Sequence, residues 1–223
     1  MPPTIAEPSR YLVAVTGSSE QQDGAGARSS RWPDRCRLPD LDVDPAPLAA
    51  EALALPAEAW VPHFHRAIYG GDWSGVALRA VGGDPSRLYP AGPELDPERT
   101  WQPTPWLTAC PETASVLAAL PFPITSVRFL RLGPGSEIRP HNDPGLGAPH
   151  GEVRLHLALV SAEGVTFGLA GEPVDLRPGE CWYLDLDQVH TATNEGSAPR
   201  IHLVVDGLVD DALAEMIVGA GSD

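Results

Sequence analysis

The sequence lacks the features that mark membrane, secreted and nucleic-acid-binding proteins. It has no apolar run near the roughly 20 residues that a membrane-spanning helix needs. Its N-terminal stretch, MPPTIAEPSR, has no basic segment followed by an apolar one, as a secretion signal would have. It is also short of positive charge, because 15 Lys and Arg stand against 30 Asp and Glu and the net charge is −15. We therefore expect a cytoplasmic protein with neither nucleic acid nor a membrane as a partner.

Cysteine is scarce as well. The three residues Cys36, Cys110 and Cys181 are odd in number and widely spaced, and no pair has the spacing of a zinc ribbon. Reduced, buried thiols are therefore expected instead of disulfides or a zinc site. Proline, in contrast, is plentiful, with 25 residues among 223, which favours loops and short strands over long helices.

The first part of the chain predicts an irregular segment followed by a helical layer. Residues 1–45 include the tract SSEQQDGAGARSSR, which cannot bury a core, so this segment is expected to be flexible or irregular, with one edge strand at 11–15. Residues 46–122 predict a layer of helices and loops with one or two strands. Its expected elements are a helix capped by Asp44, a short helix at 62–69, a strand at 72–81, a loop at 82–105 and a helix at 110–120.

After Pro123 the apolar pattern alternates with a period of two. Strands are expected at 127–132, 153–160, 165–169, 174–176, 181–186 and 201–205, followed by a C-terminal helix. Short strands at 8–12-residue spacing with Gly and Pro turns are typical of a sandwich or barrel. Residues 123–223 therefore predict a jelly roll or small barrel with a ligand cavity. The whole chain is expected to be mainly β with flanking helices.

His141, Asp143 and His190 form a candidate metal site. Residues i and i+2 of an extended segment face the same way, so His141 and Asp143 can reach one point. A later strand can bring His190 to that point. Two histidines and one carboxylate that leave open positions are the ligand set of non-haem Fe(II) oxygenases. The triplet alone is weak evidence, because such spacings occur in ordinary loops.

Arg200 adds a candidate anion site. In the segment RIHLVV, Arg200 and His202 share one strand face, and Ile201, Leu203 and Val205 form the apolar face. A buried arginine needs a partner, and its planar fork matches a carboxylate. A dicarboxylate cosubstrate would supply that partner, and an exposed surface arginine is the alternative. Arg154 and His156 repeat the pattern in VRLHLALV and are expected to line the same polar cavity.

Four segments resemble the aspartyl/asparaginyl β-hydroxylase family, which includes small bacterial enzymes such as the proline hydroxylases. They are VRFLRLGPGSEIRPHND, VRLHLAL, GECWYLDLDQVHTATN and PRIHLVVD, and they match in order over about residues 100–206. A weaker match is GDWSGVALR at 71–79. The resemblance implies a double-stranded β-helix, a cupin-like jelly roll, that uses Fe(II), O₂ and 2-oxoglutarate.

The resemblance also implies roles for residues. His141, Asp143 and His190 would bind iron, Arg200 would bind the distal carboxylate of 2-oxoglutarate, and Arg154 with His156 would contact the cosubstrate. No side chain beyond the metal centre would be catalytic. The expected reaction is hydroxylation of an unactivated C–H bond in an amino acid or an amino-acid-derived or peptidyl substrate, with release of succinate and CO₂. Asp143 argues against halogenation, which needs that ligand position open.

The substrate side is less well marked. Arg128, Arg79 and Trp182 are the candidate substrate-binding residues, and each also fits a structural use. Trp73 and Trp106 either pack in the core or wall the pocket. The alternative function is a cupin-like metal-dependent isomerase or small-molecule-binding module without 2-oxoglutarate chemistry. Such a cupin has no need of Arg200, which therefore discriminates between the two hypotheses.

Overall fold

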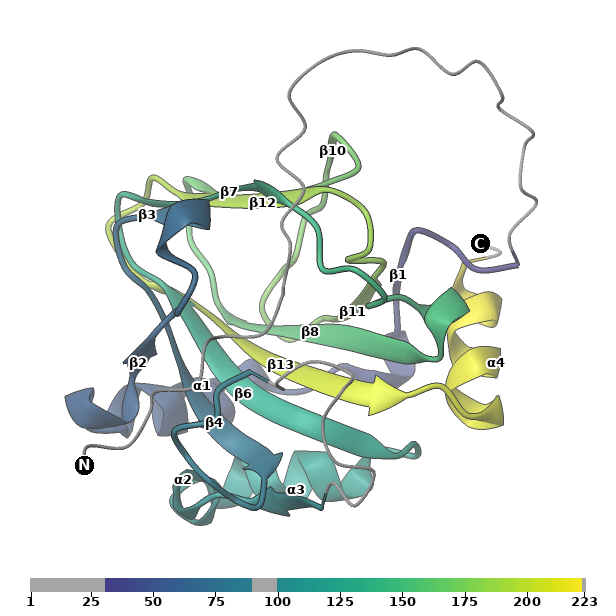
Figure 1. The fold of residues 1–223 in the computed structure, drawn as a ribbon, viewed down its shortest axis with the longest axis horizontal. Coiled ribbons are helices and arrows are strands. Elements are labelled where there is room, and N and C mark those ends of the chain that lie inside the picture. The colour runs from purple at the N-terminus through teal and green to yellow at the C-terminus, as the bar shows by residue number, and fades with distance from the viewer. Residues whose placement is uncertain (1–30, 90–99, 222–223) are drawn as a thin grey trace, which may run out of the picture.

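Two antiparallel β-sheets lie face to face in the structure, a computed structural model that describes residues 31–89 and 100–221. Figure 1 shows the smaller sheet above the larger one, with helices on the far side of the larger sheet. This arrangement is a double-stranded β-helix, as the alternating sequence pattern and the family resemblance predicted. The predicted strand at 11–15 lies outside the described residues.

The larger sheet has the order β1-β11-β8-β13-β6-β4-β2, and β5 pairs with β4 beside this path. Its strands are β1 (Arg35–Arg37), β2 (Val61–Pro62), β4 (Trp73–Val81), β5 (Trp101–Pro103), β6 (Ile124–Leu132), β8 (Glu152–Val160), β11 (Cys181–Leu184) and β13 (Arg200–Leu208). Because β1, β2, β4 and β5 precede residue 123, the N-terminal part of the chain contributes directly to this sheet.

The smaller sheet has the order β10-β9-β12-β7-β3. Its strands are β3 (Tyr69–Gly70), β7 (Ser136–His141), β9 (Val165–Leu169), β10 (Glu172–Pro173) and β12 (His190–Asn194). In the first pair of strands after residue 123, β6 lies in the larger sheet and β7 in the smaller one. The chain therefore crosses between the sheets at the turn that contains Gly135, whose φ of 68° suits glycine.

The two faces of the larger sheet have different chemistry. Its outer face packs into one apolar core that includes Val153, Leu155, Leu157, Ile201 and Leu203. The alternate residues of β8 and β13 point the other way, toward the smaller sheet, and include buried histidines and arginines. The alternation predicted for 153–160 and 201–205 is therefore confirmed, and the larger sheet separates an apolar layer from a polar interior.

In the described part of the chain, four α-helices cover the outer core, and three of them match the predictions. They are α1 (Pro45–Ala54), α2 (Pro105–Thr108), α3 (Pro111–Ala119) and α4 (Asp211–Ala220). Short 3-10 turns lie at η1 (Pro39–Leu41), η2 (Ala57–Ala59), η3 (Arg66–Ile68) and η4 (Ala148–His150). Among the described residues, none of the helices has the length and apolar character needed to cross a bilayer.

Three predicted elements are wrong. The helix predicted at 62–69 is replaced by β2, η3 and β3, because this segment pairs with strands β4 and β7 at the sheet edges. The strand predicted at 174–176 does not form, and the chain instead pairs one step earlier, at β10, with β9. The loop predicted at 82–105 contains β5, which pairs with β4. Tertiary pairing overrides local propensity in all three places.

The three cysteines are free and buried, as predicted. All three belong to the outer core, on the side of the larger sheet that faces the helices. Burial raises the pKa of Cys36 to about 12. Burial, with a smaller contribution from Glu51, raises the pKa of Cys110 to about 11.

Replacing Asp44 by alanine is expected to lower the free energy of unfolding by about 1 kcal/mol, the usual cost of losing an N-cap. The Asp44 side chain accepts a hydrogen bond from the Ala46 amide at the start of α1, as the sequence predicted. Urea denaturation would measure the change. Asp40→Ala, at an exposed position that caps no α-helix, is the control, and an equal loss in both variants would contradict the capping role.

Candidate metal centre and its surroundings

The structure brings His141, Asp143 and His190 together between the sheets. His141 ends β7, and His190 begins β12 directly opposite it in the antiparallel register. Asp143 follows β7 and is fixed there, because its amide donates to the Leu186 carbonyl at 2.8 Å. The potential ligand atoms of the three residues all lie within 4.8 Å of one another. A single cation can therefore contact all three without a change of fold.

Backbone carbonyls orient both imidazoles in the same way. Nδ1 of His141 lies 2.8 Å from the Arg139 carbonyl oxygen, and Nδ1 of His190 lies 3.1 Å from the Gln188 carbonyl oxygen. A carbonyl only accepts, so each Nδ1 carries the proton and each Nε2 keeps its lone pair. This is the usual way in which proteins fix the tautomer of a metal-binding histidine.

The site favours the protonation states that a cation needs. Burial, with help from His141, lowers the pKa of His190 to about 4, so its imidazole is neutral at neutral pH. Burial alone would raise the pKa of Asp143, but the Arg154 guanidinium and the two histidines lower it, so the carboxylate is ionised. A neutral imidazole and an ionised carboxylate are the forms that bind metal.

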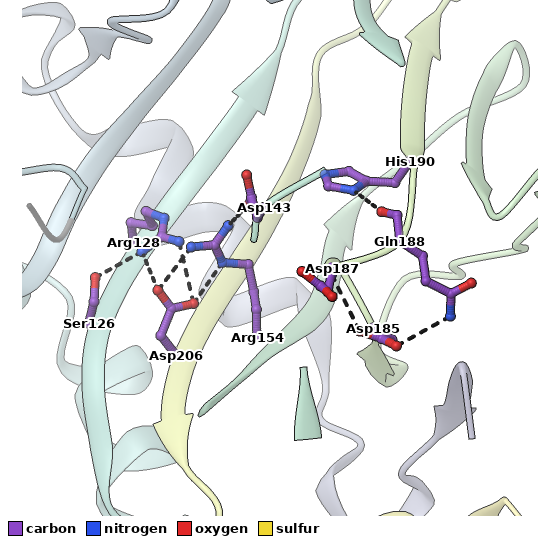
Figure 2. A network of polar contacts seen from close by, with 9 residues as sticks. All are labelled: Ser126, Arg128, Asp143, Arg154, Asp185, Asp187, Gln188, His190 and Asp206. Carbon is purple, nitrogen blue, oxygen red and sulfur yellow. Dashed lines mark hydrogen bonds and ion pairs between the residues drawn. The ribbon is translucent and has the colours of Figure 1, made fainter. Parts of the chain in front are cut away.

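A series of hydrogen-bonded charged groups holds the Asp143 side chain in place (Figure 2). Arg154 Nη1 donates to Asp143 Oδ2 at 2.7 Å, and its Nε donates to Asp206 Oδ1 at 2.7 Å. Asp206 also accepts from Arg128 Nη1 at 3.0 Å, and Arg128 donates further to Ser126 Oγ. Asp206 is 1% exposed and Arg128 0%. The carboxylate of the metal triad is thus tied, through Arg154, to a buried ion pair between Asp206 and Arg128.

Arg200 and His202 lie together on the inner face of β13, beside a cavity of ≈ 270 Å³ that both residues line. Arg200 Nε donates to His202 Nε2 at 3.1 Å, and no carboxylate pairs with Arg200 among the described residues. Burial lowers the pKa of Arg200 to about 10, which leaves it charged at neutral pH. A buried guanidinium with no counter-ion from the protein is a ready site for an anion.

Phe167 connects this cavity to the metal triad. Its ring lies 6.2 Å from that of His190, nearly parallel, and Arg200 lies over the same ring at 5.8 Å from its centroid. His156 lies beside Phe167 at 5.9 Å, and its Nε2 is buried without a hydrogen-bond partner in the described part of the chain. An anion held by Arg200 therefore sits next to both a free imidazole nitrogen and the triad.

The other predicted residues have different positions. Arg128 and Arg154 point into the interior, where both are paired with Asp206. Trp182 on β11 lies opposite His156 on β8. It packs against the apolar cluster that includes Phe167 and Leu184, and its indole N–H donates to Glu180. Arg79 stands opposite Val127, which belongs to the outer core, so the register places Arg79 away from the triad.

Sequence reasoning missed two sets of residues at this site. Asp206 falls on the same alternating face as Arg200 and His202, so the strand period was a signal for it. His63 and Tyr89 form an aromatic group with Trp73, one of the tryptophans considered above as a pocket wall, and Trp73 lies 6.2 Å from the His141 ring. His63 and Tyr89 come from irregular segments, where no periodic pattern marks a facing direction.

The chain matches a known protein family over most of its length. The family described as "Aspartyl/Asparaginyl beta-hydroxylase" matches residues 47–209. The "Aspartate beta-hydroxylase domain-containing protein 2" of Mus musculus is 33% identical over 105 residues, and the rat protein of the same name is 32% identical. The match covers 44% of this chain and 29% of each relative, so the chain spans less than a third of their length.

Among solved structures, a 2OG-Fe(II) oxygenase family oxidoreductase from Burkholderia pseudomallei has a TM-score of 0.48 and 14% identity, and the match covers 73% of this chain and 77% of that one. The non-heme alpha ketoglutarate dependent epimerase SnoN from nogalamycin biosynthesis has a TM-score of 0.48 and 17% identity, with 80% and 79% covered.

Proposed function

Because the chain belongs to the aspartyl/asparaginyl β-hydroxylase family, we propose that it is an Fe(II)- and 2-oxoglutarate-dependent dioxygenase. Its substrate would be an amino acid or an amino-acid-derived, including peptidyl, molecule that it hydroxylates at an unactivated C–H bond. The observation that supports this most strongly is the pairing of a His-Asp-His triad with a buried, carboxylate-free arginine in one interior.

The residues present fit both groups. His141, Asp143 and His190 would hold Fe(II), a ligand set typical of non-haem iron oxygenases. Arg200 would hold the distal carboxylate of 2-oxoglutarate, and the unpartnered Nε2 of His156 offers a further contact. Bound together with O₂, these groups supply the oxidation of the C–H bond, with release of succinate and CO₂.

The protein's own contribution would be to position the metal ligands and to shield the site from water. Arg154 holds Asp143 and shares Asp206 with Arg128, so the carboxylate ligand cannot turn away from the triad. Phe167 forms an apolar surface that contacts both His190 of the triad and Arg200. Such a surface excludes water and strengthens each charged contact beside it. No acid–base side chain is needed at this site.

Titration of the protein with Fe(II) and 2-oxoglutarate under anaerobic conditions tests the proposal. A visible metal-to-ligand charge-transfer band is expected with both present and not with either alone. If wild-type protein gives no such band, the oxygenase proposal fails, and the cupin-like isomerase or binding module becomes the better hypothesis.

Replacing Arg200 by alanine is expected to raise the 2-oxoglutarate concentration needed for the band by about 30-fold or more, because truncating one partner of a buried charge pair costs at least about 2 kcal/mol. The Fe(II) requirement should stay within a few-fold, since Arg200 contacts no ligand of the triad. Arg87→Ala, which removes an exposed arginine, is the control. An unchanged 2-oxoglutarate requirement in Arg200→Ala would remove its assigned role.

A further inference from the structure

An aromatic cluster borders the metal triad on the His141 side, whereas Phe167 and Arg200 border it on the His190 side. The cluster consists of His63, Phe64, Trp73 and Tyr89. The His63 ring stacks on Trp73 at 3.7 Å and 6°, and Tyr89 meets it edge-on at 4.5 Å. Phe64 also stacks on His63, with ring centroids 4.9 Å apart, and is 66% exposed. The cluster thus runs from the surface to the triad.

Three buried polar atoms of this region have no hydrogen-bond partner among the described residues. They are Trp73 Nε1, Tyr89 Oη and Arg128 Nε. The first and third are donors only, and the second can donate. A buried polar atom left unpaired is costly, and most such atoms in native proteins have a partner. Three unpaired donors without a matching acceptor indicate that an acceptor group from a ligand belongs here.

Tyr89 and Arg128 lie close enough to serve one ligand. The Arg128 guanidinium lies 5.3 Å from the centroid of the Tyr89 ring. Both terminal nitrogens of Arg128 donate to Asp206, and one of them also donates to Ser126. Nε is the nitrogen of this guanidinium that has no hydrogen-bond partner among the described residues. Burial raises the pKa of Tyr89, and its hydroxyl therefore keeps its proton at neutral pH.

The charge balance of the interior favours an anion in this place. Among the described residues, the buried Arg128 and Arg200 and the nearly buried Arg154 face two interior carboxylates, Asp143 and Asp206. Fe(II) and the 2-oxoglutarate dianion would cancel each other. One positive charge would then remain without a partner in an interior where an unpaired charge is costly. A substrate carboxylate supplies a negative charge at this place beside the arginines, whereas a neutral amide does not.

We propose that the substrate carries a carboxylate and that this group binds between Tyr89 Oη and Arg128 Nε, with Trp73 Nε1 as a third donor. The inference rests on the proposed function, because it takes the metal triad as the reacting centre. This subsite would select substrates that have a free carboxylate next to the reacting carbon chain. It would reject residues whose carboxyl groups are part of amide bonds. The exposed Phe64 forms the outer rim of this subsite.

Thermal unfolding in the presence of L-amino acids and their carboxamides tests this subsite. We would use the anaerobic Fe(II)–2-oxoglutarate complex and, separately, Zn(II)-loaded protein without 2-oxoglutarate. At least one amino acid is expected to raise Tm and perturb the visible band, and its carboxamide at the same concentration is not. Tyr89→Phe is expected to weaken that binding about tenfold, the usual effect of losing one hydrogen bond to a charged group.

The matched control is Tyr183→Phe, whose hydroxyl lies in the outer core and accepts from the Ala148 amide. It is expected to leave carboxylate binding unchanged, and Tyr89→Phe is expected to leave the 2-oxoglutarate band unchanged. If no carboxylate stabilises the protein more than its carboxamide, or if Tyr89→Phe binds as tightly as wild type, the subsite is wrong. If the wild-type protein gave no visible band but its Zn(II) form still bound the carboxylate, the proposed function would be overturned and the subsite would stand.

Discussion

Replacing His190 by alanine is expected to abolish the visible band of the Fe(II)–2-oxoglutarate complex and to reduce 2-oxoglutarate turnover to the level of metal-free protein. The substitution removes one of three ligand side chains whose donor atoms lie within 4.8 Å of one another. Changes at groups that merely orient metal ligands already cost about 10- to 100-fold in affinity or activity. Loss of a ligand should therefore weaken Fe(II) binding by more than about 100-fold, as measured by anaerobic titration.

The His190→Ala result needs a comparison that separates metal loss from misfolding. His150→Ala removes an exposed imidazole that forms only a surface pair with Asp187, so it should leave the band intact. Circular dichroism should show both variants folded, because His190 lies at the end of a strand whose backbone pairing remains. If His190→Ala kept the band at wild-type Fe(II) concentrations, the three residues would not be the ligand set.

Replacing Asp206 by alanine is expected to have the largest effect on stability, a loss of about 3–5 kcal/mol in the free energy of unfolding. Asp206 accepts hydrogen bonds from Arg128 and from Arg154, which lie on either side of it in Figure 2. Its removal would leave two guanidinium groups facing each other in the interior. Urea denaturation of the metal-free protein would measure the loss.

Asp72→Ala is the matched control for Asp206. Asp72 also pairs with an arginine, Arg131, but both side chains are partly exposed, and such pairs contribute about 0–1 kcal/mol. A loss in Asp206→Ala no larger than in Asp72→Ala would show that the network contributes nothing beyond a surface pair. Because Arg154 also holds Asp143, Asp206→Ala should in addition weaken Fe(II) binding, which Asp72→Ala should not.

The same network has a pH signature. Burial alone would raise the pKa of Asp206, but Arg128 and Arg154 lower it to about 2. A carboxyl group whose folded pKa is depressed stabilises the fold above its unfolded pKa near 3.9, and this contribution disappears as pH falls through the folded value. The stability advantage of wild type over Asp206→Asn should therefore shrink between about pH 4 and pH 2. An advantage that is constant over this window would contradict the ion-pair origin.

The alternating residues of β8 and β13 explain why so much of the interior was predictable from the sequence. Successive side chains of a strand point to opposite faces, even where both faces are buried. Since the apolar residues of each strand occupy one face, the polar ones must share the other. These are Arg154 and His156 in β8, and Arg200 and His202 in β13. The spacing of His141 and Asp143 obeyed the same rule across the end of β7. These arguments need only local geometry.

The substrate side could not be predicted in this way. Tyr89 lies in a proline-rich segment without periodicity, and His63 belongs to a segment that was predicted to be helical but forms strand and turn. Arg128 was identified as a basic residue facing the interior, but its ion pair with Asp206 joins residues 78 positions apart. Such contacts depend on strand order, which alternation does not determine.

The placement of the three cysteines has a consequence for the protein's resistance to oxidation. An oxygen-activating centre can release oxidants when turnover fails, and thiolates are the groups in proteins that such oxidants attack first. Here Cys36, Cys110 and Cys181 lie in the outer core, on the helix side of the larger sheet, and burial keeps them protonated. The full thickness of a β-sheet therefore separates the three cysteine sulfurs from the proposed site of oxygen chemistry. Oxidative damage from failed turnovers should instead fall on the histidines and aromatic rings around the metal.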